Sequence, residues 1–251
     1  MRSQNRLWLP IFLAGLFPQP IPAQNVQKPS SPVLVELFTS QGCSSCPPAE
    51  ALLNDWGMEQ FQKGNILPLA FHVDYWDYLG WKDPFSKRAY SDRQRAYARV
   101  LGSDSIYTPE MVVNGRVGFV GSDAPRAERA VAAGRSPSFA APSLKFSRTG
   151  RNLRISLELS KTQDRAQWFV ALFENGLTTK IERGENAGSE AREDFVVREL
   201  EPMPSSRGRC EFVLTLDPTW KPTQCGIAAF AQDPSTMEIK AVRWLYPLAG
   251  R

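Results

Sequence analysis

The sequence predicts an α/β domain over residues 32–134, followed by a mostly β, sandwich-like domain over residues 143–251. The first half alternates short apolar runs with helical segments, which is the pattern of strands and crossover helices. The second half shows short alternating strands and turn residues without a helical period, which is typical of a β-sandwich. Residues 135–142, rich in Ser, Pro and Ala, are predicted to link the two.

The first 23 residues have the pattern of an export signal. Arg2 and Arg6 form a positive start, and Leu7–Phe17 forms an apolar core of 11 residues. Ala23 follows a proline-rich turn as a candidate cleavage point. The core is shorter than the roughly 20 residues that a membrane-spanning helix needs, and an uncleaved anchor is the alternative. We therefore predict a periplasmic or secreted protein in an oxidising compartment.

Composition and motifs exclude several classes of function. The formal net charge of +4 falls to +2 when Arg2 and Arg6 leave with the signal. No basic run stands out, so we expect no nucleic-acid partner. The sequence also lacks a nucleophile elbow, a phosphate loop and a zinc-protease motif.

A buried strand and a cysteine pair organise the first half. The strand Val33–Thr39 runs through a short turn into Cys43 and Cys46, and a helix is expected from Pro48 to about residue 62. Two cysteines at this spacing can close as a redox disulfide or bind a soft metal. Because Pro47 and Pro48 lack N–H groups, the regular helix is expected to begin near Pro48 and to leave the cysteines on a looser turn.

The next elements continue the α/β order. Ile66–Val73 reads as a central buried strand, and a helix is expected from Ser86 to about Leu101. Between them, the aromatic segment Asp74–Phe85 is either a loop packed over a site, a partner surface or a loop attached by its aromatic rings alone.

A proline and a hairpin follow. Thr108-Pro109 leads into a strand, and Asn114-Gly115 predicts a tight turn before the returning strand Val117–Val120. Asp123 is then expected to cap a helix. The order up to about residue 134 is therefore β-(CxxC)-α-β-α-β-β-α.

The second half is predicted to consist of short strands. They are expected at Leu153–Leu159, Trp168–Phe173, Leu177–Ile181, Phe195–Leu200, Phe212–Leu216, Gly226–Ala231 and Glu238–Trp244. Asn175-Gly176 predicts a hairpin between the second and third of these. The segment Arg183–Gly188 has the composition of a specific loop without a readable function.

Cys210 and Cys225 form a candidate structural disulfide, because exported proteins with an even number of cysteines commonly pair them. Each cysteine begins a predicted strand, however. In a simple hairpin the two would lie at opposite ends, roughly 20 Å apart and beyond disulfide reach. The sequence leaves this pair open.

The first domain resembles the thioredoxin superfamily, and its local spacing is most similar to that of glutaredoxins. The whole chain resembles a family of exported thioredoxin-like proteins of unknown function, through ELFTSQGCSSCPP, HVDYWDYLGW, YTPEMVVNG and ENGLTTKIERGEN. The resemblance implies an α/β thioredoxin-like fold for the first domain. It also implies that Cys43 attacks, that Cys46 resolves the mixed disulfide, and that Pro109 is cis.

The same resemblance assigns further site residues. With Pro109 cis, the backbone of Thr108 would hold a substrate strand. Glu36 would be the buried acid that assists proton transfer to the second cysteine, while a carboxylate at a strand edge is its simpler interpretation. His72, the only histidine, is expected to make a structural hydrogen bond, with a copper site on Cys43, Cys46 and His72 as the alternative.

Two classes of function follow from the sequence. The first is an exported thiol–disulfide oxidoreductase without a bound cofactor, acting on protein or small-molecule thiols and disulfides, with a membrane-bound electron donor or acceptor as a candidate partner. The second is a non-catalytic binding protein on the same fold, either a copper carrier or a partner-binding module. The sandwich domain would brace the redox domain or recognise a partner.

Overall fold

The computed structural model describes residues 32–135, 142–158, 166–203 and 208–248. The predicted signal peptide, residues 1–23, and most of the predicted linker, residues 136–141, lie outside the described residues. Within these ranges no helix is both long and apolar enough to cross a membrane.

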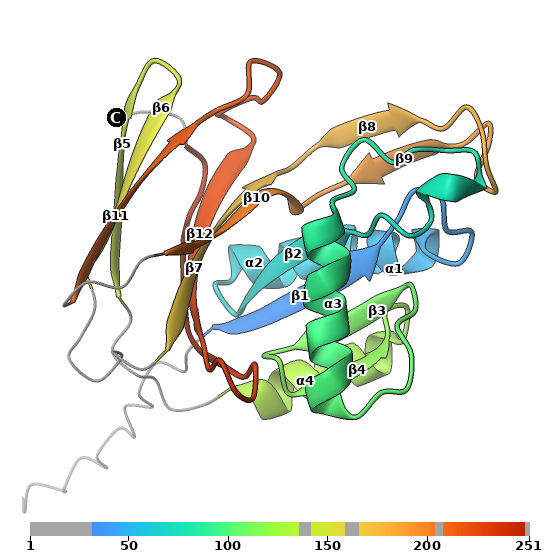
Figure 1. The fold of residues 1–251 in the computed structure, drawn as a ribbon, viewed down its shortest axis with the longest axis horizontal. Coiled ribbons are helices and arrows are strands. Elements are labelled where there is room, and N and C mark those ends of the chain that lie inside the picture. Colours follow the sequence, from blue (N-terminus) through green and yellow to red (C-terminus); the bar gives the residue numbers. More distant parts are fainter. Residues whose placement is uncertain (1–31, 136–141, 159–165, 204–207, 249–251) are drawn as a thin grey trace, which may run out of the picture.

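The N-terminal part has the predicted α/β order (Figure 1). Its elements are β1 (Val33–Thr39), α1 (Pro47–Leu52), the π-helical segment η1 (Leu53–Gly57), α2 (Met58–Gln62), β2 (Ile66–His72), the 3-10 turn η2 (Asp77–Leu79), α3 (Arg88–Leu101), β3 (Glu110–Val113), β4 (Val117–Val120) and α4 (Ala124–Gly134). This β-α-β-α beginning is consistent with a thioredoxin-like fold.

The C-terminal part is made of strands, as predicted. They are β5 (Ser143–Thr149), β6 (Asn152–Glu158), β7 (Gln167–Glu174), β8 (Leu177–Lys180), β9 (Glu190–Glu193), β10 (Val196–Met203), β11 (Arg209–Thr215), β12 (Cys225–Gln232) and β13 (Ile239–Leu245). The predicted fold class, an α/β part followed by a mostly β part, is confirmed.

One sheet runs through both parts, in the strand order β13-β12-β7-β10-β2-β1-β3-β4. The junction is the parallel contact of β10 with β2, where Val196 pairs with Ala70. There the Ala70 N–H donates to the Phe195 carbonyl at 2.8 Å. The two predicted domains are therefore joined by hydrogen bonds between strands of one sheet, as well as by the covalent chain.

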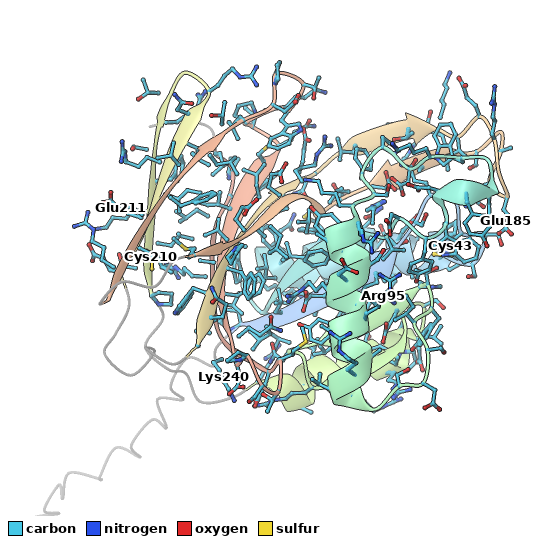
Figure 2. The ribbon with its side chains drawn as sticks, in the orientation of Figure 1. Cys43, Arg95, Glu185, Cys210, Glu211 and Lys240 are labelled. Atoms are coloured by element: carbon cyan, nitrogen blue, oxygen red, sulfur yellow. A yellow bond between two sulfur atoms is a disulfide. The ribbon has the colours of Figure 1, made fainter. Side chains whose placement is uncertain are left out.

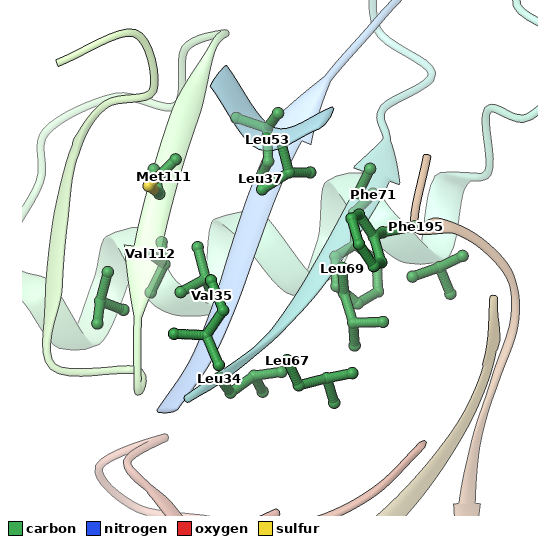
Figure 3. Packing of buried hydrophobic residues seen from close by; sticks show 14 of the residues in the cluster. Leu34, Val35, Leu37, Leu53, Leu67, Leu69, Phe71, Met111, Val112 and Phe195 are labelled. Carbon is green, nitrogen blue, oxygen red and sulfur yellow. The ribbon is translucent and has the colours of Figure 1, made fainter. Parts of the chain in front are cut away.

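Two hydrophobic cores lie on this sheet. Helix α3 covers one face of the N-terminal strands and α1 to α2 lie behind them (Figure 1). Figure 3 shows Leu53 of the first helical region beside Leu37 of β1 within the larger core. A second core joins Trp168 of β7 to Ile155 and Leu157 of β6, in the separate sheet β11-β6-β5. The eight-stranded and three-stranded sheets, packed through this second core, form the predicted sandwich.

The two Asn-Gly turns have different outcomes. Asn114-Gly115 forms the predicted hairpin between β3 and β4, with φ values of 50° and 65° that suit the tight turn. The predicted hairpin at Asn175-Gly176 is wrong, because β7 pairs with β10 and β12 while β8 pairs with β9. Because both edges of β7 are already paired, β8 cannot pair with β7 and instead forms a separate two-stranded sheet with β9.

Candidate redox site

The predicted cysteine pair forms a disulfide. Cys43 lies in a turn after β1, where its N–H donates to the Ser40 carbonyl at 3.1 Å. The Cys46 N–H in turn donates to the Cys43 carbonyl at 3.2 Å, and Cys46 is the N-cap of α1. The helix begins at Pro47, so the cysteines precede it on a turn, as the two prolines predict.

The second predicted site segment lies beside this turn. The Thr108–Pro109 peptide bond is cis, as the resemblance implies. The Ser45 hydroxyl approaches the Thr108 carbonyl at 3.4 Å. Gly121 faces the same region: a β carbon added to it would lie 2.7 Å from Leu37 and 3.2 Å from Pro109, so only glycine fits there without a shift.

The aromatic segment packs over the cysteine turn. Trp76 lies against Gly42, where an added β carbon would be 3.2 Å from the Trp76 Cβ, and its indole N–H donates to the Thr108 hydroxyl at 2.7 Å. The Trp81 indole N–H donates to the Gln41 side-chain oxygen at 3.1 Å. Of the three interpretations of this segment, the loop over a site is the one that these contacts support.

Gln41 connects three segments at the site. Its backbone N–H donates to Asp83 and its side-chain amide donates to Glu193, each at 2.8 Å. Its carbonyl accepts from the Asn186 side chain at 2.9 Å. Gln41 therefore fixes the turn that carries Cys43 to both the aromatic segment and the β8–β9 hairpin.

The tip segment, residues 182–188 between β8 and β9, touches the cysteine turn directly. The Asn186 amide donates to the Cys43 carbonyl at 3.0 Å, and the Ser44 N–H donates to the Glu185 carboxylate at 3.2 Å. Figure 2 shows Cys43 and Glu185 at the same end of the molecule. The sequence marked this loop as specific but gave no sign of its place, since the contacts cross more than 140 residues.

The disulfide is closed to solvent. Cys43 and Cys46 are both 0% exposed, whereas Ser44 and Ser45 between them are exposed. The two serines therefore form the exposed part of the turn, while both cysteines are covered.

A buried polar cluster lies behind Gln41. His72 Nδ1 is 2.7 Å from Asp83 Oδ2, and His72 Nε2 is 3.7 Å from Glu193 Oε1. Neither the Nε2 atom nor the Oε1 atom has a hydrogen-bond partner among the described residues. The predicted structural hydrogen bond of His72 is thus present, together with a second carboxylate, Glu193, whose Oε2 atom accepts from Gln41 and whose Oε1 atom has no hydrogen bond among the described residues.

The charges of this cluster shift one another's pKa values. Burial opposes the positive charge of His72, but Asp83 and Glu193 outweigh it and raise the His72 pKa to about 9. Burial raises the pKa of Glu193 to about 7, against the attraction of His72. Burial would also raise the pKa of Asp83, but His72 lowers it overall. At neutral pH, Glu193 therefore titrates beside a charged imidazolium.

Glu50 lies between this cluster and Cys46. Its backbone N–H donates to the Cys46 carbonyl at 3.1 Å, so the two residues are one helical turn apart and share a helix face. Its carboxylate accepts from the Thr39 hydroxyl at 2.6 Å. Burial raises the Glu50 pKa, partly countered by this hydrogen bond. Sequence reasoning did not single out Glu50, although the i, i+4 spacing from Cys46 was a usable signal.

A pocket of about 310 Å³ opens beside Glu50, between α1 and the β8–β9 hairpin. It is lined by Gln41, Pro47, Glu50, Ala51, Asn54, Asp55, Ile181, Asn186, Ser189, Glu190, Ala191 and Arg192. Glu50 therefore lies on the wall of a pocket that also borders the cysteine turn at Gln41 and Pro47.

Glu36 is placed elsewhere. It is fully buried, accepts from Arg93 Nε at 2.6 Å and from the Tyr97 hydroxyl, and both partners belong to α3. Thr39, which binds Glu50 of α1, lies three positions along β1 and so points to the opposite face. The structure therefore joins Glu36 to α3 and does not bring it to the helix that follows the cysteines.

The copper alternative is not assembled. The ring nitrogens of His72 face Asp83 and Glu193, and the cysteine sulfurs are bonded to each other. In the described ranges no three His, Cys, Asp or Glu side chains are arranged to hold a metal ion.

Cys210 and Cys225 are separate, buried thiols, so the candidate structural disulfide is not formed. Cys210 pairs with Leu157 in the three-stranded sheet, whereas Cys225 pairs with Glu174 in the eight-stranded sheet. The two cysteines lie on strands of different sheets, which is not the simple hairpin that the sequence analysis considered.

Comparison with known proteins identifies one family and similar structures. The family described as "Protein of unknown function (DUF1223)" matches residues 34–232, and no curated protein matches the chain. Protein AGR_C_4864 from Agrobacterium tumefaciens is similar, with 27% identity and a TM-score of 0.63 over 87% of this chain and 96% of that one. HBP35 of Porphyromonas gingivalis has 12% identity and a TM-score of 0.63, over 88% and 77% of the chains. At 12% identity, the latter likeness concerns the fold alone.

Proposed function

The chain belongs to the DUF1223 family, whose function is unknown, and from that premise we propose that it is an exported thiol–disulfide oxidoreductase using Cys43 and Cys46. The observation that carries the proposal is the disulfide on a turn at the start of a helix, where the Ser45 hydroxyl of that turn approaches the Thr108 carbonyl. A structural disulfide needs neither a neighbouring titratable cluster nor a carboxylate one turn away. Thiol–disulfide exchange uses both the titratable cluster and the carboxylate, because thiolates are formed and later protonated during the reaction.

In this proposal Cys43 is the sulfur that partners attack and Cys46 is the leaving and resolving thiol. Glu50 takes the place that sequence reasoning gave to Glu36. It accepts the proton when the Cys46 thiol attacks, and it returns the proton when Cys46 leaves. Burial raises the pKa of Glu50 above the usual value for a glutamate, which suits a group that both gives and takes a proton.

The remaining parts of the proposal extend the sequence-based expectations. Partners are protein or small-molecule thiols and disulfides, and a membrane-bound protein is a candidate electron donor or acceptor. The protein works in the periplasm or outside the cell, where disulfides persist. The backbone of Thr108 contributes to holding the substrate segment.

A second function is favoured by one observation. Both sulfurs are 0% exposed, which suits a static disulfide in a partner-binding protein. In that case the cysteine turn and the tip segment would form one rigid surface, and electrons would never enter the pair.

The reduction potential of the Cys43–Cys46 pair decides between the two. The mature protein is equilibrated in glutathione buffers, and a midpoint between roughly −120 and −270 mV is expected for a catalyst. The Cys43→Ser and Cys46→Ser variants should lose exchange activity, whereas the matched Cys210→Ser control should keep it. A pair that stays oxidised well below roughly −300 mV would favour the binding protein.

A further inference from the structure

A pocket of about 390 Å³, here called the seam pocket, lies where helix α3 meets the C-terminal strands. Helix α3 contributes Ala89, Arg93 and Ala96, which are spaced so that they share one face of the helix. Strands β7 and β10 contribute Phe169 and Leu200, and the end of β12 with the turn before β13 supplies most of the rest. The seam pocket shares no lining residue with the pocket beside the cysteine turn, so the two are separate.

The walls of the seam pocket are mainly apolar. The apolar lining residues include Ala89, Ala96, Phe169, Leu200 and Met237. Pockets that hold small molecules typically have volumes of roughly 300–1,000 Å³ and apolar walls with a few polar groups, and they occur preferentially where two parts of a protein meet. The seam pocket has each of these features, at the lower end of the size range.

Two buried polar side chains also line this pocket. Arg93 is 8% exposed and Gln232 is 3% exposed. Each of the three guanidinium nitrogens donates one hydrogen bond, to Glu36, Gln232 and Tyr97. Because a guanidinium carries five N–H groups, two of them have no acceptor among the described residues. A buried N–H group without an acceptor costs free energy, which the acceptor of a ligand would recover.

The charges that line the seam pocket disfavour an anionic ligand. Glu36, 2.6 Å from Arg93, already balances the positive charge of the guanidinium. Asp233 also lies on the wall, and hydrogen bonds from Ser235 and Thr236 lower its pKa to about 2, so it is negative at neutral pH. An anion would meet this charge without an unbalanced cation to offset it, and a cation would face the N–H donors of Arg93. An uncharged molecule with a hydrogen-bond acceptor meets neither penalty.

We propose that the seam pocket binds a small, uncharged, mainly apolar molecule whose hydrogen-bond acceptor, such as a carbonyl oxygen, meets the guanidinium of Arg93. Because the lining comes from both parts of the protein, the bound molecule contacts both parts and stabilises their junction. The site uses neither the cysteine pair nor Glu50. It therefore goes beyond the proposed function and does not depend on it.

The test measures the binding of three fluorescent probes to the mature protein. Prodan is uncharged and mainly apolar and carries a carbonyl group. Phenylnaphthylamine is uncharged and apolar but has no carbonyl group, and anilinonaphthalene sulfonate is an anion. Dissociation constants are obtained by titration of the protein, followed through the fluorescence of each probe. Thermal unfolding with and without prodan measures the stabilisation by the bound molecule.

We expect prodan to bind most tightly, with a dissociation constant of roughly 1–100 μM. Phenylnaphthylamine should bind about tenfold more weakly, because it offers no carbonyl oxygen to Arg93. The sulfonate should bind more weakly than either uncharged probe. Saturating prodan should raise the unfolding temperature by a few degrees, because it binds only the folded protein.

Two variants locate the binding to the seam pocket. Ala96→Trp fills the pocket from α3 and should weaken prodan binding by more than about tenfold. Val100→Trp is the matched control, because Val100 is 41% exposed on the same helix and does not line the pocket, and it should change binding by less than about twofold. The double variant Glu36→Leu/Arg93→Met removes the donor together with its buried counter-charge. It should weaken prodan binding about tenfold and change phenylnaphthylamine binding by less than about twofold.

Other outcomes overturn the inference. Equal prodan binding by the wild type and Ala96→Trp would mean that the probe adsorbs elsewhere on the protein. Equal weakening of both uncharged probes in the double variant would mean that Arg93 shapes the pocket without donating to a ligand. Tightest binding of the sulfonate would mean that the site selects anions. Each of these results concerns the seam pocket alone and leaves the proposed function unchanged.

Discussion

Two buried polar clusters join the α/β part to C-terminal strands, and they differ in how completely their polar atoms are hydrogen-bonded. In the Arg93 cluster (Arg93, Glu36, Tyr97 and Gln232), the guanidinium donates to Glu36, to Gln232 at 3.0 Å and to Tyr97 at 3.0 Å. In the His72 cluster (His72, Asp83 and Glu193), one imidazole faces two carboxylates, and two polar atoms have no hydrogen-bond partner among the described residues.

This difference indicates a structural role for the Arg93 cluster and a chemical role for the His72 cluster. Buried polar groups are normally fully hydrogen-bonded, so the Arg93 cluster reads as an attachment between α3 and the sheet. Its Arg93 also lies 5.3 Å from the ring centre of Phe230, which ties in the C-terminal part. Buried polar atoms without a hydrogen bond cost stability, so the two unpaired atoms of the His72 cluster indicate a function. The His72 cluster is also the one that contacts the cysteine turn, through Gln41.

The largest effect is expected on stability from Arg93→Met. It leaves the Glu36 carboxylate buried without its cation, which should cost about 3–5 kcal/mol of unfolding free energy. Urea denaturation measures the loss, and the double variant Glu36→Leu/Arg93→Met should recover part of it. The reduction potential of the disulfide should stay unchanged. A large change in the reduction potential would mean that the Arg93 cluster also influences the disulfide, contrary to the role assigned to it.

The next effect is the pH dependence of stability that the His72 cluster creates. His72 and Glu193 both have folded pKa values above their ordinary values, about 9 and about 7. Each therefore contributes stability that is full below its ordinary pKa and is lost as pH rises through the folded pKa. Unfolding free energy should fall from about pH 5 to pH 9, by roughly 3 kcal/mol for His72 alone.

The double variant His72→Gln/Glu193→Gln checks this assignment. Urea denaturation at pH 5, 7 and 9 should give a much flatter profile than the wild type, because neither amide titrates. The Arg93→Met variant should keep the slope of the wild type. An unchanged slope in the double variant would show that other groups set the pH dependence.

A smaller effect is expected on the rate of exchange. Glu50→Gln should slow thiol–disulfide exchange about tenfold or more near neutral pH, because the Cys46 proton loses its acceptor. Glu36→Gln is the matched control and should change the rate by less than about twofold. The pH profile of the rate should lose one ionisation only in Glu50→Gln. Equal slowing in the Glu50→Gln and Glu36→Gln variants would mean that Glu36 also takes part in the exchange reaction.

The smallest effect is expected at the second cysteine pair. Burial, together with the nearby Glu174, raises the pKa of the Cys225 thiol to about 12. Iodoacetamide at pH 8 should therefore modify only Cys43 and Cys46 in the folded, reduced protein, and all of the cysteines after unfolding. Modification of Cys225 or Cys210 in the folded state would contradict this.

Local pattern was enough for much of the fold and for the centre of the site. Continuous apolar runs located β1 and β2, and the Asn114-Gly115 turn located the β3–β4 hairpin. The spacing of Cys43 and Cys46 predicted either a disulfide or a soft-metal site, and the structure has the disulfide. These features follow from residues close in sequence, whose burial period and turn geometry are set by the chain itself.

The tertiary structure alone decided which side chains surround that disulfide. Glu36 meets α3 and Glu50 meets Thr39 because of which face of β1 packs on each helix, and an error of one residue reverses the face. The arrival of Asn186 at Cys43, and the pairing of β10 with β2, join residues more than 100 positions apart. Such contacts form because apolar faces find partners across the fold, and no local period records which partner that will be.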